Sequence, residues 1–254
     1  MTAPLFFVGL HQPSNAQHFE RACISINRIR ERKSSFPAKS WIMDSGAFTE
    51  IATHGRYRAS VEEYAHEARR WVGSGNLLAI VAQDYMCEPF ILRKTGLTVD
   101  IHQRLTIERY DALLAAKVGC HVLPTLQGYD PADYVRHVRL YGDRLTAGMW
   151  VGVGSVCKRN GSPGDIENVL ASIKVVRPDL RLHGFGLKLS ALLHDGVRAL
   201  LHSADSMAWS FSARKQGRSA NDWREAKRFE ERVNHASALP RSAWQIPLPL
   251  EAAA

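Results

Sequence analysis

Short apolar runs rich in β-branched residues alternate along this chain with amphipathic helical stretches, and this alternation constrains the fold more than any other feature. The runs are LFFVGL (5–10), WIMDSG (41–46), LLAIVAQDY (77–85), HVLPTLQG (121–128), MWVGVGS (149–155), LHGFGLK (182–188) and ADSMAWS (204–210). Strands that are apolar almost throughout are typical of a parallel sheet covered by helices. The pattern therefore predicts an α/β fold.

The stretches between these runs carry helix end signals. Ser60 is placed as an N-cap, and Glu63 three residues later completes a capping box. Asp130 followed by Pro131 has the order of a cap and a first-turn proline. A third helix, which begins near SPGD, is expected to close before Pro178. Strand followed by helix is thus the predicted repeating unit.

A chain of 254 residues with seven such runs fits a (β/α)8 TIM-like barrel better than an open sheet, although the eighth strand is not evident. No Pro/Gly/Ser-rich linker divides the chain, so we expect one domain over residues 1–254, with 214–254 as a basic C-terminal helical segment and tail. In such a barrel, functional residues lie at the carboxyl ends of the strands.

Basic residues outnumber acidic ones and give a formal net charge of +8, which fits a polyanionic partner. They gather between Arg21 and Lys33 and between Arg214 and Arg232. Both stretches also fit the solvated face of a helix. No run of about 18 uncharged apolar residues occurs and the first residues lack a basic n-region, so we expect a soluble cytoplasmic protein.

Metal, disulfide and nucleotide-loop motifs are missing from the sequence. The four cysteines, Cys23, Cys87, Cys120 and Cys157, form no C-x-x-C pair. The histidines near them or on helical stretches show no ligand spacing: His54, His66, His121, His194 and His202. GVGS lacks the third glycine of a dinucleotide loop, and no phosphate-loop motif occurs. We therefore expect neither a metal nor another cofactor.

Acids, an amide and glycines follow the predicted strands. Asp44, Asp84 and Asp205 each stand where an apolar run ends. The other strand-end residues are Gln127, Gly128, Gly152, Val153, Gly154, His183, Gly184 and Gly186. One such aspartate alone most often caps a helix, and one such glycine usually marks close packing. Three acids at one mouth cost electrostatic energy unless a function uses them.

These residue types suit glycosyl transfer to or from a flat base. One carboxylate can attack an anomeric carbon while a second moves a proton. An amide, a third carboxylate and backbone N–H groups can read the edge of a heterocycle, and Phe48 can stack on its face. An unrelated glycoside hydrolase would also pair acids, but it would place more aromatic residues around a sugar cleft.

In these strand-end motifs the chain resembles the tRNA-guanine transglycosylase superfamily, and more closely its shorter 7-deazaguanine DNA transglycosylase branch. DSGAF (44–48) is similar to the family's D-S-G-G-F, with Ala47 in place of the second glycine. The stretches VAQDY, LQG, VGVGS and LHGFG resemble its pocket-aspartate strand, V-Q-G, glycine-rich strand and L-M-G-V-G. ADSMAWSFSAR (204–214) is similar to its nucleophile segment. The resemblance covers residues 5 to about 215 and keeps the family's order.

The resemblance implies a role for each matching residue. Asp205 would attack C1′ of a guanine nucleotide to give a covalent glycosyl-enzyme, and Asp44 would take a proton from the incoming deazapurine (preQ0-type). Phe48 would stack on the base, while Asp84, Gln127, Gly128 and the backbone of 152–154 would read its edge. His183 and Gly184 match a lid-like stretch over the base.

The choice of nucleic acid depends on where the chain departs from the family. The C-x-C-x-x-C zinc module of the tRNA enzymes is missing, and Ala208, Trp209 and Ser210 follow the nucleophile in place of the family's residues. These departures favour DNA, with the target base flipped out of the duplex. Arg214, Lys215 and Arg218 are the predicted phosphate contacts. Trp209 or Trp223 would stack on an unpaired base, or else pack in the core.

Two alternatives stay open. A tRNA transglycosylase without its zinc module would run the same reaction on another substrate. A non-catalytic nucleic-acid-binding subunit would keep the barrel but would have no need of both Asp44 and Asp205. The expected partners are guanine-containing DNA and a free 7-deazaguanine base, with a second copy of the chain or other modification proteins as further partners and no membrane.

Overall fold

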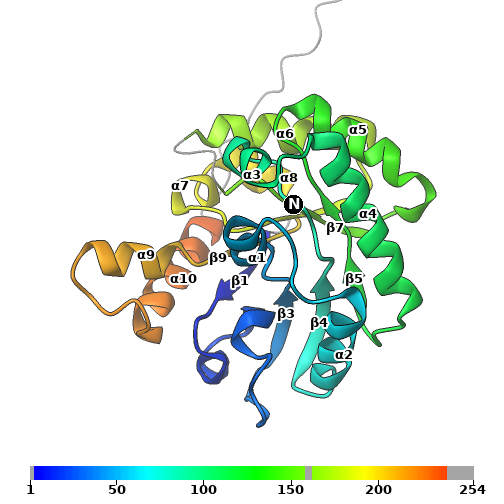
Figure 1. Cartoon of the computed structure of the whole chain (residues 1–254). Coiled ribbons are helices and arrows are strands. Elements are labelled where there is room, and N and C mark those ends of the chain that lie inside the picture. The colour runs from blue at the N-terminus through cyan, green and yellow to red at the C-terminus, as the bar shows by residue number, and fades with distance from the viewer. Residues whose placement is uncertain (1–2, 158–161, 239–254) are drawn as a thin grey trace, which may run out of the picture.

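The computed structural model describes residues 3–157 and 162–238, which form one sheet of parallel strands surrounded by helices (Figure 1). The strands are β1 (Leu5–Gly9), β2 (Arg21–Ser25), β3 (Ser40–Asp44), β4 (Asn76–Val81), β5 (His121–Leu123), β6 (Thr125–Leu126), β7 (Trp150–Val153), β8 (Arg181–Gly184) and β9 (Ser203–Ser206). Their order is β5-β4-β3-β2-β1-β9-β8-β7-β6, and every pair is parallel. The predicted α/β class is confirmed.

The sheet curls into a nearly closed barrel because its two ends are halves of one segment. β5 and β6 are separated only by Pro124, which has no N–H to give to a ladder. β5 pairs with β4, and just beyond β4 the Ala82 N–H donates a hydrogen bond to Leu123 O at 3.0 Å. The second half meets β7, where Gly152 N–H donates to Pro124 O at 2.8 Å. Counting β5 and β6 as one, the nine strands make eight staves, and the predicted TIM-like barrel is confirmed.

The stave that the sequence pattern hides is β2. Its apolar part is only Ala22 to Ile24, and it begins at Arg21, inside the basic stretch that we interpreted as a helix face. That interpretation is wrong for residues 21–25, which pair with β1 and β3. The links on either side of β2 contain the short 3-10 helices η1 (Pro13–His18) and η2 (Ile26–Arg28), so the strand–helix rhythm is broken here.

The remaining crossovers carry α-helices. These are α1 (Ala47–His54), α2 (Val61–Trp71), α3 (Pro89–Thr95), α4 (Val99–Ala115), α5 (Pro131–Tyr141), α6 (Pro163–Val176), α7 (Leu189–Leu192) and α8 (Asp195–Leu200), with η3 (Gly142–Arg144) after α5. The predicted capping box is present, since Glu63 N–H donates to Ser60 Oγ at 3.1 Å and Ser60 N–H to Glu63 Oε2 at 2.7 Å. Helix α6 ends before Pro178, as the sequence predicts.

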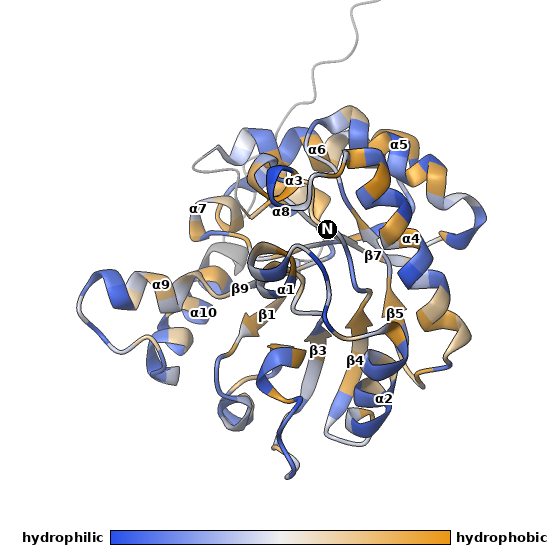
Figure 2. Ribbon diagram, in the orientation of Figure 1, coloured by the Kyte–Doolittle hydropathy of each residue, from blue (hydrophilic) through white to orange (hydrophobic). Residues whose placement is uncertain are grey.

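Two hydrophobic layers hold the barrel together. The larger lies between the strands and the helices. Hydrophobic and hydrophilic residues alternate along the helices that surround the strands (Figure 2). The smaller fills the barrel interior and contains Phe7, Cys23, Ile42, Ala79, Val81 and Leu123. Side chains alternate along a strand, so a residue two positions after an interior one also points inward. Asp44 stands in this relation to Ile42, which is why a carboxylate meets the interior at the mouth.

Two helices follow the last strand, and they extend to one side of the barrel in Figure 1: α9 (Ala208–Lys215) and α10 (Trp223–Ala238). α10 packs against β1. The connection from β1 to β2 contains only the 3-10 helix η1 and no α-helix. Phe229 packs on Phe6 with ring centroids 6.0 Å apart, and Trp223 stacks on His18 at 3.9 Å. The expected basic C-terminal segment therefore also completes the helical layer; residues 239–254 of that prediction lie outside the described residues.

Both tryptophans considered for base stacking are structural. Trp209 is buried, and its Nε1–H donates to Gly9 O at 2.8 Å. Trp223 is half-buried between His18 and the helical layer. Of the two readings that the sequence left open for Trp209, core packing is the one that the structure supports. Within the described residues no helix is long and apolar enough to span a membrane.

Replacing Phe229 by alanine tests whether α10 is part of the folded barrel. The buried ring leaves a cavity against Phe6, so we expect Phe229→Ala to lower the free energy of unfolding by about 3 to 5 kcal/mol in urea titrations. The control Val175→Ala removes a side chain that is 82% exposed and should change it by less than about 0.5 kcal/mol. Equal effects of the two changes would mean that α10 does not pack on β1.

Candidate active site

The three predicted acids lie at the carboxyl ends of three staves. Asp44 is the last residue of β3, Asp205 is the third residue of β9, and Asp84 follows β4 by three residues. In the sheet order, β1 and β2 stand between the staves that carry Asp205 and Asp44. Residues from opposite ends of the chain are thus brought to the same mouth.

Asp44 is partly exposed at the mouth, and its carboxylate is held by two donors. Gly46 N–H donates to Asp44 Oδ2 at 3.0 Å, and the Ser25 hydroxyl from the paired strand β2 also bonds the side chain. Gly46 has φ +74°, a conformation that glycine adopts without strain. Burial of the carboxyl, and then the nearby charge of Asp205, raise the pKa of Asp44 to about 6.

The loop after β8 holds the carboxylate of Asp205. Gly186 N–H lies 2.9 Å from Oδ1 and 3.2 Å from Oδ2, and Leu187 N–H donates to the backbone O of Asp205 at 3.0 Å. Ser206 Oγ donates to Leu187 O at 2.6 Å and ties the loop to β9. A backbone N–H that points at both oxygens fixes the orientation of the carboxylate. The two mouth acids therefore sit in different environments.

His183 lies one layer deeper in the barrel than Asp205. It pairs in register with Ser203, two residues before Asp205, and it is completely buried against the rings of Phe7, Trp150 and Phe185. The side chain thus lies inside the barrel below Asp205, and its expected place over the base stays a prediction. A strand residue whose side chain faces the barrel interior is buried by the staves around it, whatever family motif it matches.

The tautomer of His183 follows from its neighbours. Trp150 Nε1–H can only donate, and it donates to Ser203 Oγ at 2.8 Å. The Ser203 hydroxyl can in turn donate to His183 Nδ1 at 2.9 Å, and in the tautomer with this bond the ring proton is on Nε2. That Nε2 has no hydrogen-bond partner among the described residues and lies 3.6 Å from Asp205 Oδ2. A small approach of the two groups would create a charge-assisted bond to the carboxylate.

Asp84 and Gln127 form a buried pair. Gln127 Nε2–H donates to Asp84 Oδ2, and Ser45 Oγ donates to Asp84 Oδ1 at 3.3 Å. The other end of the amide, Gln127 Oε1, accepts from Ser155 Oγ at 2.8 Å. Burial, and then the charge of Asp44, raise the pKa of Asp84 to about 7. Both side chains are thus held in position by hydrogen bonds. A ligand that bound them would replace the hydrogen bond between Gln127 and Asp84 with bonds of its own.

The strand-end glycines fall into two groups. A Cβ on Gly152 would meet the Phe185 ring at 2.3 Å, and one on Gly154 would meet Gln127 Nε2 at 2.1 Å, so both glycines make room for mouth side chains. A Cβ on Gly128 or Gly184 would instead meet Asp133 at 2.6 Å or Leu187 at 2.8 Å. The latter two glycines serve close packing. The Val153 side chain is buried in the outer hydrophobic layer, and its backbone O accepts from Phe185 N–H at 3.4 Å.

Phe48 and the basic residues after β9 lie at the surface. Phe48 is 44% exposed and meets Phe90 edge-on, with centroids 6.4 Å apart. Arg214 and Lys215 are exposed and lie over the ring of Phe211, at 5.5 and 4.8 Å from its centroid. Arg218 forms an ion pair with Glu225 at 2.6 Å, which occupies its guanidinium. The structure thus separates Arg218 from the other two predicted phosphate contacts.

Several residues that shape the site had no signal in the sequence. Ser25, Ser45 and Ser155 bond the acids or Gln127, yet serines in turns are common. Ser155 has φ +55°, a conformation that is uncommon for a residue with a side chain and that clusters at functional sites. Gly186 stood in a quoted motif, but its contact with Asp205 depends on the loop that follows β8.

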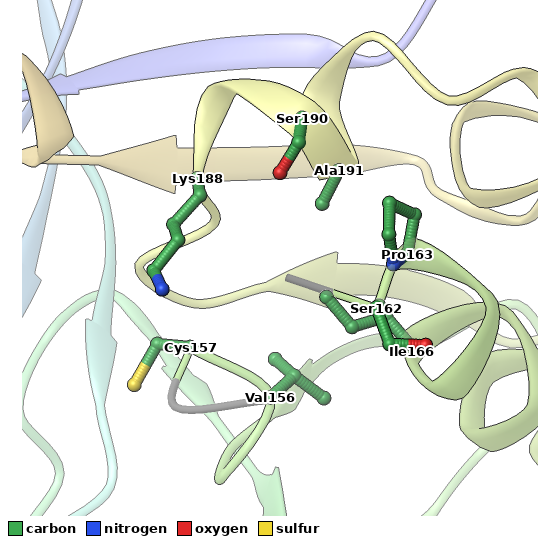
Figure 3. A pocket seen from close by; sticks show the side chains of 8 residues that line it. All are labelled: Val156, Cys157, Ser162, Pro163, Ile166, Lys188, Ser190 and Ala191. Atoms are coloured by element: carbon green, nitrogen blue, oxygen red, sulfur yellow. The ribbon is translucent and has the colours of Figure 1, made fainter. Parts of the chain in front are cut away.

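Neither a group of metal ligands nor a separate pocket marks the mouth within the part of the chain that the structure describes. Among the described residues no three His, Cys, Asp or Glu side chains are grouped so that they could hold a metal. A small pocket between the start of α6 and α7 is lined by Val156, Cys157, Ser162, Pro163, Ile166, Lys188, Ser190 and Ala191 (Figure 3). It contains none of the three acids, so the carboxylates and not this hollow define the candidate site.

The raised pKa of Asp84 predicts a pH-dependent stability. Asp84 titrates near pH 7 when folded and near 3.9 when unfolded, so between these values the folded state binds more protons and loses stability as pH rises. Asp84→Asn removes this loss. From pH 5 to pH 8 we expect the wild type to lose on the order of 2 kcal/mol relative to the variant in urea titrations.

The control for this titration is Asp179→Asn. The hydrogen bond from Arg177 lowers the pKa of Asp179, so that group is ionised in both states over the same pH range. The stability difference between the wild type and this control should therefore stay constant from pH 5 to pH 8. A constant difference for Asp84→Asn as well would mean that Asp84 is not held in a protonating environment.

Comparison with known proteins adds one finding. The family model of DpdA, described as "DeoxyPurine in DNA protein A", matches residues 3–222. The matched range contains all nine strands and the three mouth acids. No curated protein matches the chain.

Proposed function

We propose that this chain, which belongs to the DpdA (DeoxyPurine in DNA protein A) family, exchanges guanine in DNA for a 7-deazaguanine base through a covalent aspartyl-glycosyl intermediate. The observation that carries the proposal is the pairing of two unlike acids at one mouth. Gly186 N–H donates to Asp205 and orients its carboxylate, whereas burial and the Asp205 charge raise the pKa of Asp44 to about 6, so that a fraction of Asp44 carries a proton near neutral pH.

The reaction would begin with displacement of guanine. An Asp205 carboxylate oxygen forms a bond to C1′ as the bond from C1′ to N9 of guanine breaks, and the departing base keeps the electron pair. Protonated Asp44 gives its proton to the leaving base and becomes a carboxylate. The products of this half-reaction are free guanine and an Asp205 ester of the sugar.

The second half-reaction reverses the roles. The incoming 7-deazaguanine gives its N9 proton to the Asp44 carboxylate, and its nitrogen attacks C1′ as the bond from C1′ to Asp205 breaks. Asp205 returns to the carboxylate and Asp44 to the acid, so no external proton or cofactor is consumed. A pKa of about 6 suits a group that must both give and accept a proton near neutral pH.

Base recognition would use the pre-oriented pair beside the acids. Asp84 and Gln127 present a carboxyl and an amide whose positions are set by Ser45 and Ser155. The backbone of 152–154 is a further contact that the family resemblance implies, and Phe48 offers an exposed ring for stacking. Exchanging the bond between Asp84 and Gln127 for bonds to a base edge would favour purines with matching donors and acceptors over other ligands.

DNA is the substrate that the family description and the charge of the chain support. A guanine in a duplex must leave the stack to reach Asp205. Phe211 is 53% exposed on α9, and Arg214 and Lys215 flank its ring, so this group replaces Trp209 and Trp223 as our candidate for contact with the opened strand. Arg218 contributes through its ion pair with Glu225 to the link between α9 and α10.

The adduct separates the roles of the two acids. Asp205→Asn should abolish both turnover and a covalent protein–DNA species on denaturing gels, because an amide cannot form the ester. Asp44→Asn should slow exchange by about 100-fold or more while the nucleophile stays intact. An adduct that survives in Asp205→Asn would show that another group attacks C1′, and exchange at the wild-type rate in Asp44→Asn would remove Asp44 from the mechanism.

The substrate is tested by exchange of radiolabelled guanine. Purified protein is offered duplex DNA and, separately, bulk tRNA, with Asp205→Asn as the control for each. We expect label in DNA only, and none with the variant. Label in tRNA would keep the chemistry and change the substrate, whereas no label in either nucleic acid would favour the non-catalytic subunit.

A further inference from the structure

A cluster of polar groups around His11 stands at the mouth and takes no part in the reaction described above. His11 follows β1, and its ring joins two segments that are far apart in the sequence. Arg28 donates from Nη2 to His11 Nδ1 at 3.2 Å, and His11 Nε2 lies 2.8 Å from Ser210 Oγ on α9. Arg214 follows Ser210 by one helical turn and therefore shares its face of α9.

The strand register places this cluster beside the two reacting acids. Phe7 pairs with Asp205, and His11 comes four residues after Phe7 along β1 and its loop. Ser25 pairs with Asp44, and Arg28 comes three residues after Ser25. β1 and β2 are the two staves between those of Asp205 and Asp44. The cluster thus occupies the part of the rim that separates the acids.

The hydrogen bonds of the cluster leave one hydroxyl proton without an acceptor in the cluster. A guanidinium only donates, so His11 Nδ1 accepts from Arg28 and the ring proton lies on Nε2. That proton goes to Ser210 Oγ, which leaves the Ser210 hydroxyl proton free for another acceptor. Burial and the charges of Arg28 and Arg214 lower the pKa of His11, which keeps the ring neutral in this arrangement.

The positive charge of the cluster is not balanced by the protein. Neither Arg28 nor Arg214 makes an ion pair within residues 3–157 and 162–238, whereas Arg58, Arg144, Arg177 and Arg218 all do. Two unpaired guanidiniums and a hydroxyl donor beside the same neutral imidazole match the charge and the tetrahedral oxygens of a phosphate group.

We propose that Arg28, Ser210 and Arg214, arranged around His11, bind a backbone phosphodiester of the DNA strand that carries the target nucleotide. This inference rests on the proposed function, because it takes the nucleotide to be attached at C1′ to Asp205. The phosphodiester fixes the register of the strand at the rim, so that one sugar stands between Asp205 and Asp44. His11 is a positioning residue that orients Arg28 and Ser210.

Binding of a fluorescent DNA duplex, followed by anisotropy over a range of salt concentrations, tests the cluster without requiring turnover. Arg28→Gln and Arg214→Gln should each weaken binding by about 5- to 10-fold and lower the salt slope by about 1. Arg139→Gln is the matched control, because Arg139 is an exposed arginine on α5 that takes no part in the cluster. Equal weakening by the control would reduce the effect to overall charge and overturn the proposal.

A neutral methylphosphonate, placed at one phosphate at a time near the target guanine, identifies the contacted group. At one position the wild type should bind about 5- to 10-fold more weakly, and Arg28→Gln should then bind that duplex as well as the wild type does. If Arg28→Gln weakens every duplex by the same factor, no single phosphodiester is held by the cluster and the proposal fails.

Two further measurements distinguish a failure of the proposed phosphate contact from a failure of the proposed base exchange. Inorganic phosphate alone, added to the wild type, should leave the Tm unchanged at 5 mM; a rise that Arg28→Gln abolishes, with DNA affinity unchanged, would assign a free-anion site instead. If label exchange fails but the methylphosphonate result holds, the phosphate contact stands and the proposed chemistry falls. If exchange succeeds and the Kd and KM of Arg28→Gln equal the wild-type values, the phosphate contact alone is wrong.

Discussion

The parallel backbone ladder, joined around the barrel at residues 121–126, is the constraint on which the site depends. Pro124 interrupts the stave, yet its carbonyl still accepts from Gly152 N–H, so the segment pairs with β4 through one half and with β7 through the other. Parallel staves have all their carboxyl ends on one side. The three acids lie at that same side because each stands at or just beyond the carboxyl end of its strand: Asp44, Asp84 and Asp205.

Bringing three carboxylates together costs electrostatic energy. The contacts around each of the three acids differ, and so do their effects on the acids. Asp205 has Gly186 N–H against both oxygens, which stabilises its charge. Asp84 is buried and Asp44 is half-buried, each near another carboxylate, and their pKa values are raised to about 7 and about 6. The result is a mouth in which one carboxylate is held by a backbone N–H and the two others have pKa values close to neutral pH. That division supports acid–base exchange at the mouth better than three equivalent carboxylates would.

The segment after β9 serves both the fold and the rim. α10 covers β1 through Phe229 and Trp223, in place of the α-helix that the crossover from β1 to β2 lacks. α9 begins three residues after Asp205, holds Trp209 in the core, and presents Ser210, Phe211 and Arg214 beside the mouth. A movement of α9 would therefore change both the packing of Trp209 in the core and the position of the proposed phosphate contact.

The sequence by itself determined the order of seven strands, the capping of α2 and the presence of acids at strand ends, because alternation and capping are local properties. It missed β2, whose three apolar residues are too few to stand out beside Arg21 and the basic run after it. It also gave no sign that His183 is buried inside the barrel, since a family motif does not say which face of a strand a side chain occupies. Only the tertiary structure decided the pKa values of Asp44 and Asp84, the hold of Gly186 on Asp205 and the grouping of Arg28 with Arg214. Each of these depends on burial and on charges from residues that are distant in the chain and that only the folded barrel brings close.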